Sequence, residues 1–254
     1  MRAKPPAPQQ LRLPIGKGST RQFRPVDWVQ QGAKGYAQAQ GLNWKDPGPA
    51  TTFNPEAGHA TYLAYRNELR RGGGEQPGIR ESYEALRHHI GRQWEYMTSP
   101  THQGGMGMRF EVPEKEPYAS HQEMVADVTR NRRIKVFPST DTPHEFLSGQ
   151  DLEKFRAVHD VFGHAAVGRS FSREGEDVAY RSHAQMFPPE AQPALASELR
   201  GQNAWLNYGP GGFVAQNLGK LVGLPQWASQ GSGAPPRPST GRIKRRGTRQ
   251  LSLF

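Results

Sequence analysis

Apolar residues recur at helical spacing along several stretches of the chain. Over residues 80–97 they fall every three or four positions, which predicts a helix with one face in a core. A similar pattern predicts helices over residues 60–70, after Ser120 and from about Asp151 onward. Ser120 and Ser148 are suited to cap two of these helices, because a serine hydroxyl can accept the unpaired backbone N–H groups of a first turn.

Two short stretches follow a different pattern, in which apolar and polar residues alternate. Met108–Val112 and Ile134–Phe137 are enriched in β-formers and are typical of strands. Two short strands among many helices predict a mainly helical fold, of the α+β type with two short strands.

Composition limits how much of the chain can belong to this fold. The mean hydropathy is −0.81, only 34% of the 254 residues are hydrophobic, and Gly and Pro number 29 and 22. Both ends are rich in Pro, Gly and basic residues and lack periodicity. We therefore expect a flexible basic arm at residues 1–26, a single helical domain at residues 27–228, and a disordered basic tail at residues 229–254.

The net charge of +10 is concentrated at the two ends of the chain. Residues 1–26 and 231–254 each carry six Lys or Arg and no acid, which leaves 21 basic against 23 acidic residues between them. The middle is thus nearly neutral, and only the tails are suited to contact DNA or another acidic surface.

Two absences narrow the function classes further. The chain has no Cys, so that a metal would have to be held by histidines and carboxylates. No apolar run approaches the length of a membrane span or a signal peptide, and we expect a soluble, cytoplasmic protein.

The segment HDVFGH carries the clearest chemical signal. His159 and His164 are five residues apart, which on a regular α-helix would place them about 140° from each other. The two side chains can meet on one metal only if the helix loosens or ends between them, and Gly163 is the residue that permits this.

HDVFGH resembles the iron-binding motif of the aromatic amino acid hydroxylases, of the bacterial phenylalanine hydroxylase type, over roughly residues 130–205. The resemblance implies an Fe(II) site with two histidines and one later glutamate, and by the order of the elements that glutamate is Glu198. It also implies a tetrahydropterin reductant. Zn is the alternative metal for the same residues. The arginine that binds the amino-acid carboxylate in that family has no counterpart here. The chain is also similar to uncharacterised proteins of phages and mobile DNA.

Other residues near the motif compete for the same roles. Glu174, Glu176 and Asp177 are alternatives to Glu198 as the third ligand. His183 is a spare nitrogen ligand, or a residue that contacts the ligands or the substrate. His159–Asp160 also forms the pair found in HD-type metal phosphohydrolases. That interpretation would need an upstream histidine and a downstream aspartate, for which His121 and Asp177 are available.

The chain ends in a pentapeptide that is similar to the motif by which many bacterial replication and repair proteins bind the DNA sliding clamp. Such an extended peptide can place apolar side chains in a pocket while a glutamine binds at the rim. The nearby basic residues would then lie close to the DNA inside the clamp. The pentapeptide consists of Gln250, Leu251, Ser252, Leu253 and Phe254, and the basic residues are Arg242, Lys244, Arg245, Arg246 and Arg249.

Together these features predict a clamp-recruited oxygenase or hydroxylase that depends on non-haem iron and acts in DNA replication or DNA modification. The predicted catalytic and metal-binding residues are His159, His164 and Glu198. The main alternative is a non-catalytic, replication-associated protein of a phage or bacterium that binds the clamp through its last five residues.

Overall fold

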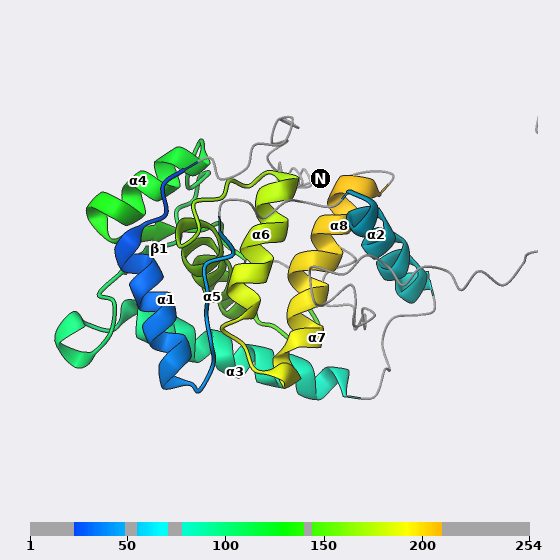
Figure 1. The fold of residues 1–254 in the computed structure, drawn as a ribbon, viewed down its shortest axis with the longest axis horizontal. Coiled ribbons are helices and arrows are strands. Elements are labelled where there is room, and N and C mark those ends of the chain that lie inside the picture. Colours follow the sequence, from blue (N-terminus) through cyan, green and yellow to red (C-terminus); the bar gives the residue numbers. More distant parts are fainter. Residues whose placement is uncertain (1–22, 49–54, 71–77, 140–143, 210–254) are drawn as a thin grey trace, which may run out of the picture.

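A computed structural model of the chain describes residues 23–48, 55–70, 78–139 and 144–209, and this part is mainly helical, as predicted (Figure 1). Short 3₁₀ turns and two π-helical segments join the α-helices. The α-helices are α1 (Asp27–Ala39), α2 (Pro55–Arg70), α3 (Ile79–Thr98), α4 (His121–Asn131), α5 (Gly149–His159), α6 (Arg173–Ala184), α7 (Gln192–Leu195) and α8 (Gln202–Tyr208).

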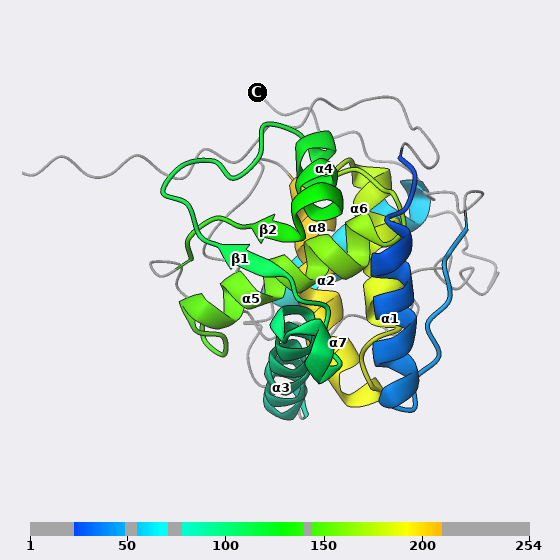
Figure 2. The ribbon, with the colours of Figure 1, turned by 90° about the vertical axis from the view of Figure 1, so that its left-hand side faces the viewer.

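The two predicted strands are present and pair with each other. β1 (Arg109–Glu111) and β2 (Arg133–Lys135) run parallel, with Phe110 opposite Ile134. The chain between them forms α4, which packs against β2 (Figure 2). This crossover is the arrangement that parallel strands require, because a tight turn cannot join them.

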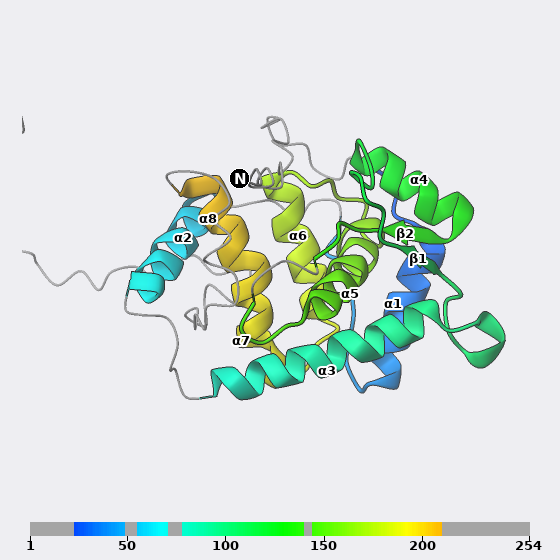
Figure 3. The same ribbon diagram turned by 180° about the vertical axis from the view of Figure 1, so that it is seen from behind.

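The predicted apolar stripe of α3 faces the core. Tyr83, Leu86, Ile90 and Met97 are at most 1% exposed, and α3 packs against α5 in the body of the molecule (Figure 3). Full burial of one such side chain contributes roughly 1.5–3 kcal/mol, so that this face fixes where α5 lies.

Both helices with predicted serine caps begin as expected. The Ser120 hydroxyl accepts from the backbone N–H of Glu123 at the start of α4. Ser148 and Asp151 cap each other's backbone groups at the start of α5. The second cap sets the register of the helix that ends at His159.

A smaller layer covers one end of the body, where α2 lies beside α8 (Figure 1). Trp205 of α8 packs edge-on to Tyr65 of α2, with ring centres 6.4 Å apart. Gly201 allows this approach, because a Cβ there would lie 2.5 Å from a ring carbon of Tyr65. Among the helices of the described part, none is long and apolar enough to cross a membrane.

Candidate metal centre

The chain changes its helical form between the two histidines of HDVFGH. α5 ends at His159, and the next six residues, Asp160–Ala165, form a π-helix. In a π-helix the hydrogen bonds join residues five apart, as between the N–H of Ala166 and the carbonyl of Val161 (2.9 Å). Residues at this spacing therefore lie above one another, and the rings of His159 and His164 are 5.0 Å apart at their centres.

Gly163 contributes to this arrangement by its size. It has a negative φ, so that backbone freedom is not what it provides. A Cβ at this position would lie 2.9 Å from Nδ1 of His159 and 3.2 Å from the carbonyl oxygen of Ala179. The glycine thus makes room for the first histidine ring and for the close approach of α6.

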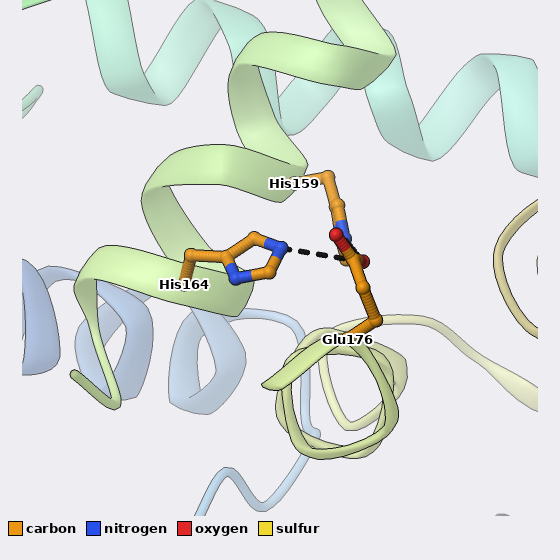
Figure 4. A group of neighbouring side chains, drawn as sticks. All are labelled: His159, His164 and Glu176. Carbon is orange, nitrogen blue, oxygen red and sulfur yellow. Dashed lines mark ion pairs between the residues drawn. The ribbon is translucent and has the colours of Figure 1, made fainter. Parts of the chain in front are cut away.

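The carboxylate that faces both histidines is that of Glu176, in the first turn of α6. Its Oε2 lies 3.5 Å from Nε2 of His159 and 3.4 Å from Nε2 of His164 (Figure 4). One ligand atom from each of the three residues falls within 4.8 Å of the others. Ser172 caps α6 by accepting from the N–H of Gly175, and so fixes the turn that presents the carboxylate.

Glu198, the glutamate predicted from the resemblance, occupies a different cluster. It lies on the second π-helical segment, Ala196–Gly201, and accepts hydrogen bonds from three side chains. The donors are the hydroxyl of Tyr83, Nε2 of His144 (3.2 Å) and the amide of Gln202 (2.6 Å). The structure therefore brings Glu176, and not Glu198, to the two histidines.

The other acidic alternatives pair with arginines and do not belong to the group of His159 and His164. Glu174 pairs with Arg173, and Asp177 pairs with Arg181 and Arg200. Asp177 links α6 to the second π-helical segment through Arg200, whereas Arg181 lies on α6 itself. Asp177 does not join the group that an HD-type phosphohydrolase site would require.

The surroundings of His164 define which of its nitrogens carries hydrogen. Its Nδ1 lies 3.1 Å from the backbone carbonyl of Arg169, which can only accept. Nδ1 is therefore the N–H donor, and in the neutral ring Nε2 presents a lone pair toward Glu176. This Nε2 is buried and has no hydrogen-bond partner.

His159 has the same arrangement with a different partner. Its Nδ1 faces Nδ1 of His183 at 3.3 Å, and its Nε2 is buried without a hydrogen bond. His183 thus contacts the outer side of His159 instead of the carboxylate, and its own Nε2 lies 2.7 Å from Oε1 of Gln93. Nothing in the local sequence around Gln93 indicated this role, because the residue comes from α3, far away in the chain.

The electrostatics of the group favour a positive charge between the three side chains. Burial would raise the pKa of Glu176, but His164 and His159 outweigh it and hold that pKa well below its usual range. Burial would likewise lower the pKa of His164, yet the Glu176 carboxylate raises it. Burial dominates at His159, whose pKa is lowered. The carboxylate is therefore ionised and attracts a proton or a cation to the histidines.

Two further polar side chains lie beside the group. His121 is 5% exposed, neither of its ring nitrogens has a hydrogen-bond partner, and its ring centre is 6.0 Å from that of His164. Burial, reinforced by His164, lowers the pKa of His121 to about 3, so that the ring is neutral. Burial raises the pKa of Asp160 to about 7.

The group is closed on the histidine side and more open at the glutamate. The side chains of His159 and His164 are 9% and 1% exposed, whereas that of Glu176 is 26% exposed. An exogenous molecule would therefore approach past Glu176. Two imidazole lone pairs and a carboxylate are suitable ligands for Fe(II) or Zn(II).

No protein-family model, curated protein or solved structure matches this chain.

Proposed function

We propose that the protein is a metalloenzyme in which His159, His164 and Glu176 hold one Fe(II) ion, and that it is an oxygenase or hydroxylase. The observation that carries the proposal is the convergence of three acceptor atoms, two of them buried imidazole nitrogens without a hydrogen bond. An unpaired buried polar atom costs about 1–3 kcal/mol. A divalent cation would satisfy all three acceptors at once.

The choice of iron rests on the set of donors. Two histidines and one carboxylate form the ligand set of non-haem Fe(II) oxygenases, in which they leave coordination positions open for O2 and substrate. Zn(II), the alternative metal, accepts the same ligands with water in the fourth position and would favour hydrolysis. The tetrahydropterin reductant is supported by the resemblance of HDVFGH alone, and that resemblance is weakened because its order of elements placed the carboxylate at Glu198.

Metal content and open coordination test this proposal together. Untagged protein prepared without oxygen should contain about one iron per chain and, with nitric oxide, give the electron paramagnetic resonance signal of an Fe(II)–NO complex. Glu176→Ala should lose both. Glu174→Ala is the matched control. It removes a carboxylate from the same helix turn, but this carboxylate pairs with Arg173 and not with the histidines. Stoichiometric zinc in place of iron, or no metal at all, would contradict the oxygenase.

We further propose that the protein is recruited to the bacterial DNA sliding clamp. It would then act in the cytoplasm of a bacterial cell, encoded by the bacterium or by a phage. Support comes from the sequence of Gln250–Phe254, which lies outside the described residues together with the basic positions 242–249. A base or nucleotide at the replication fork is then the substrate class that fits the location.

The clamp proposal has an experiment of its own. Removal of Gln250–Phe254 should abolish capture of the protein by an immobilised sliding clamp. A variant with the five residues in scrambled order should lose capture as well. Unchanged capture would contradict the proposal. Clamp binding combined with an absence of iron would favour the non-catalytic, replication-associated alternative.

A further inference from the structure

We propose that Gln93 and His183 are positioning residues that fix the hydrogen of His159 on Nδ1 and thereby keep its Nε2 free for a cation. This inference rests on the proposed metal centre. It concerns why Nε2 of His159 is available to bind a cation and does not instead donate a hydrogen bond to Glu176. The four groups from the carbonyl of Met186 to His159 are called the relay below.

The direction of the relay is set by a backbone carbonyl. Nε2 of Gln93 donates to the carbonyl oxygen of Met186 (3.2 Å). With its amide flipped, Gln93 would place its oxygen against that carbonyl oxygen, two acceptors without a donor. Oε1 of Gln93 therefore faces Nε2 of His183, 2.7 Å away, and Gln93 is fully buried.

The orientation of Gln93 determines which nitrogen of His183 carries the hydrogen. Because Oε1 of Gln93 only accepts, Nε2 of His183 must carry the hydrogen. The ring is fully buried and lies against the rings of Phe155, Phe162 and Phe187. A ring so fully buried among apolar neighbours is neutral, because burial disfavours the charged form. A neutral ring with its hydrogen on Nε2 presents a lone pair at Nδ1.

His159 then has only one arrangement that satisfies the relay. Its Nδ1 lies 3.3 Å from Nδ1 of His183, which can only accept in this tautomer, so that Nδ1 of His159 must be the N–H donor of that contact. Its Nε2 is left as an acceptor 3.5 Å from the Glu176 carboxylate. Without the relay, Nε2 would carry the hydrogen and donate to Glu176, which would close the site to a cation.

The two histidines of the site are thus held in the same tautomer by different means. His164 relies on the backbone carbonyl of Arg169, which substitution of side chains does not remove. His159 relies on two side chains from α3 and α6. Changes in the relay should therefore alter the tautomer of His159 and leave that of His164 as an internal reference.

The test is the tautomer of each histidine in metal-free protein, read from long-range ¹H–¹⁵N correlation spectra above the pH at which the rings titrate. Wild type should show hydrogen on Nδ1 of both His159 and His164. In His183→Phe the hydrogen of His159 should move to Nε2, while His164 stays unchanged. Affinity for Co(II) should fall about 10–100-fold, as for other residues that orient a metal ligand.

Two more variants complete the experiment. Gln93→Leu should give the same change of tautomer to a smaller extent, and it decides the question if His183→Phe does not fold. His89→Phe is the matched control, because His89 of α3 also packs against Phe187 but is outside the relay. Hydrogen retained on Nδ1 of His159 in both relay variants, or found on Nε2 in wild type, would overturn the proposal. If wild type has the expected tautomers and binds no Co(II), the metal centre fails and the relay stands.

Discussion

Two largely buried groups of histidine and glutamate lie in the described part of the chain, and they differ in how their hydrogen-bond donors and acceptors match. In the Glu198 cluster (Glu198, Tyr83, His144 and Gln202) every carboxylate contact comes from a donor. In the proposed metal centre (His159, His164 and Glu176) the carboxylate faces two imidazole nitrogens that have no hydrogen-bond partner. Residues of the same types thus form a satisfied structural cluster in one place and an unsatisfied one in the other.

The difference arises at the far nitrogen of each ring. Nδ1 of His144 accepts two backbone N–H groups, from Phe146 (3.1 Å) and Leu147 (2.9 Å), so that its Nε2 carries the hydrogen and donates to Glu198. Nδ1 of His164 instead donates to a backbone carbonyl, which leaves Nε2 as an acceptor. For these two rings, the backbone group at Nδ1 therefore decides whether Nε2 faces its glutamate as a hydrogen-bond donor or as an acceptor.

The largest expected effect is on cation affinity. Glu176→Ala should weaken Co(II) binding by more than about 100-fold, because loss of a ligand should exceed the effect of residues that only orient ligands. Glu198→Ala should leave the affinity unchanged, because its partners are elsewhere. Titration followed by the visible absorption of Co(II) measures both. Equal losses in the two variants would remove the distinction between the groups.

The order of the two variants should be reversed when stability is measured in place of cation affinity. Glu198→Ala should lower the free energy of unfolding by about 2–3 kcal/mol, because it leaves buried donors of Tyr83, His144 and Gln202 unpaired. Burial and the Glu198 carboxylate raise the pKa of Tyr83 well above its usual value, so that its hydroxyl remains a donor at any physiological pH. Denaturant unfolding of chelated protein gives the comparison. A larger loss in Glu176→Ala than in Glu198→Ala would reverse the assignment.

The pH dependence should differ between chelated and cation-loaded protein. The pKa of His164 is raised above 6.5, so that its stabilisation is complete below that pH and is lost as pH rises through the folded-state pKa. The pKa of Glu176 is lowered from 4.5, and its stabilisation is present above that value and lost at lower pH. Chelated protein should therefore lose stability above about pH 6.5, whereas cation binding, which needs neutral His164, should strengthen. The melting temperature, measured across this pH range with and without cation, tests the prediction. The same pH dependence in both samples would contradict the account.

The smallest effect concerns His121, the unpaired histidine beside the metal centre. His121→Phe should raise the free energy of unfolding by about 1 kcal/mol, because a ring of similar shape replaces a buried polar one. Phe23 and Phe171 already contact this ring and would pack on the new one. Urea unfolding measures the change. A destabilised variant would show that the nitrogens of His121 have a partner in the folded protein.

The sequence predicted the parts of this structure that depend on local pattern. The stripe on α3, the serine caps and the short strands follow from spacing over a few residues. The spacing of His159 and His164 also required a departure from regular α-helix, and the structure has a π-helix there.

The remaining parts depend on contacts between distant segments. Which acid faces the histidines depends on the rotation of α6 about its axis, and Glu174, Glu176 and Asp177 are too close in sequence to be separated by pattern. Likewise Gln93 of α3 meets His183 of α6, and His144, which precedes α5, meets Glu198 of the second π-helical segment, only because the chain folds these distant segments together. No short-range signal marks such pairs.

The most direct test of the metal centre is to locate a cation. Crystals of protein loaded with Co(II), measured at the cobalt absorption edge, should give one strong anomalous difference peak within about 2.0–2.2 Å of Nε2 of His159, Nε2 of His164 and a carboxylate oxygen of Glu176. A peak at Glu198, or no peak near the two histidines at full loading, would contradict the account.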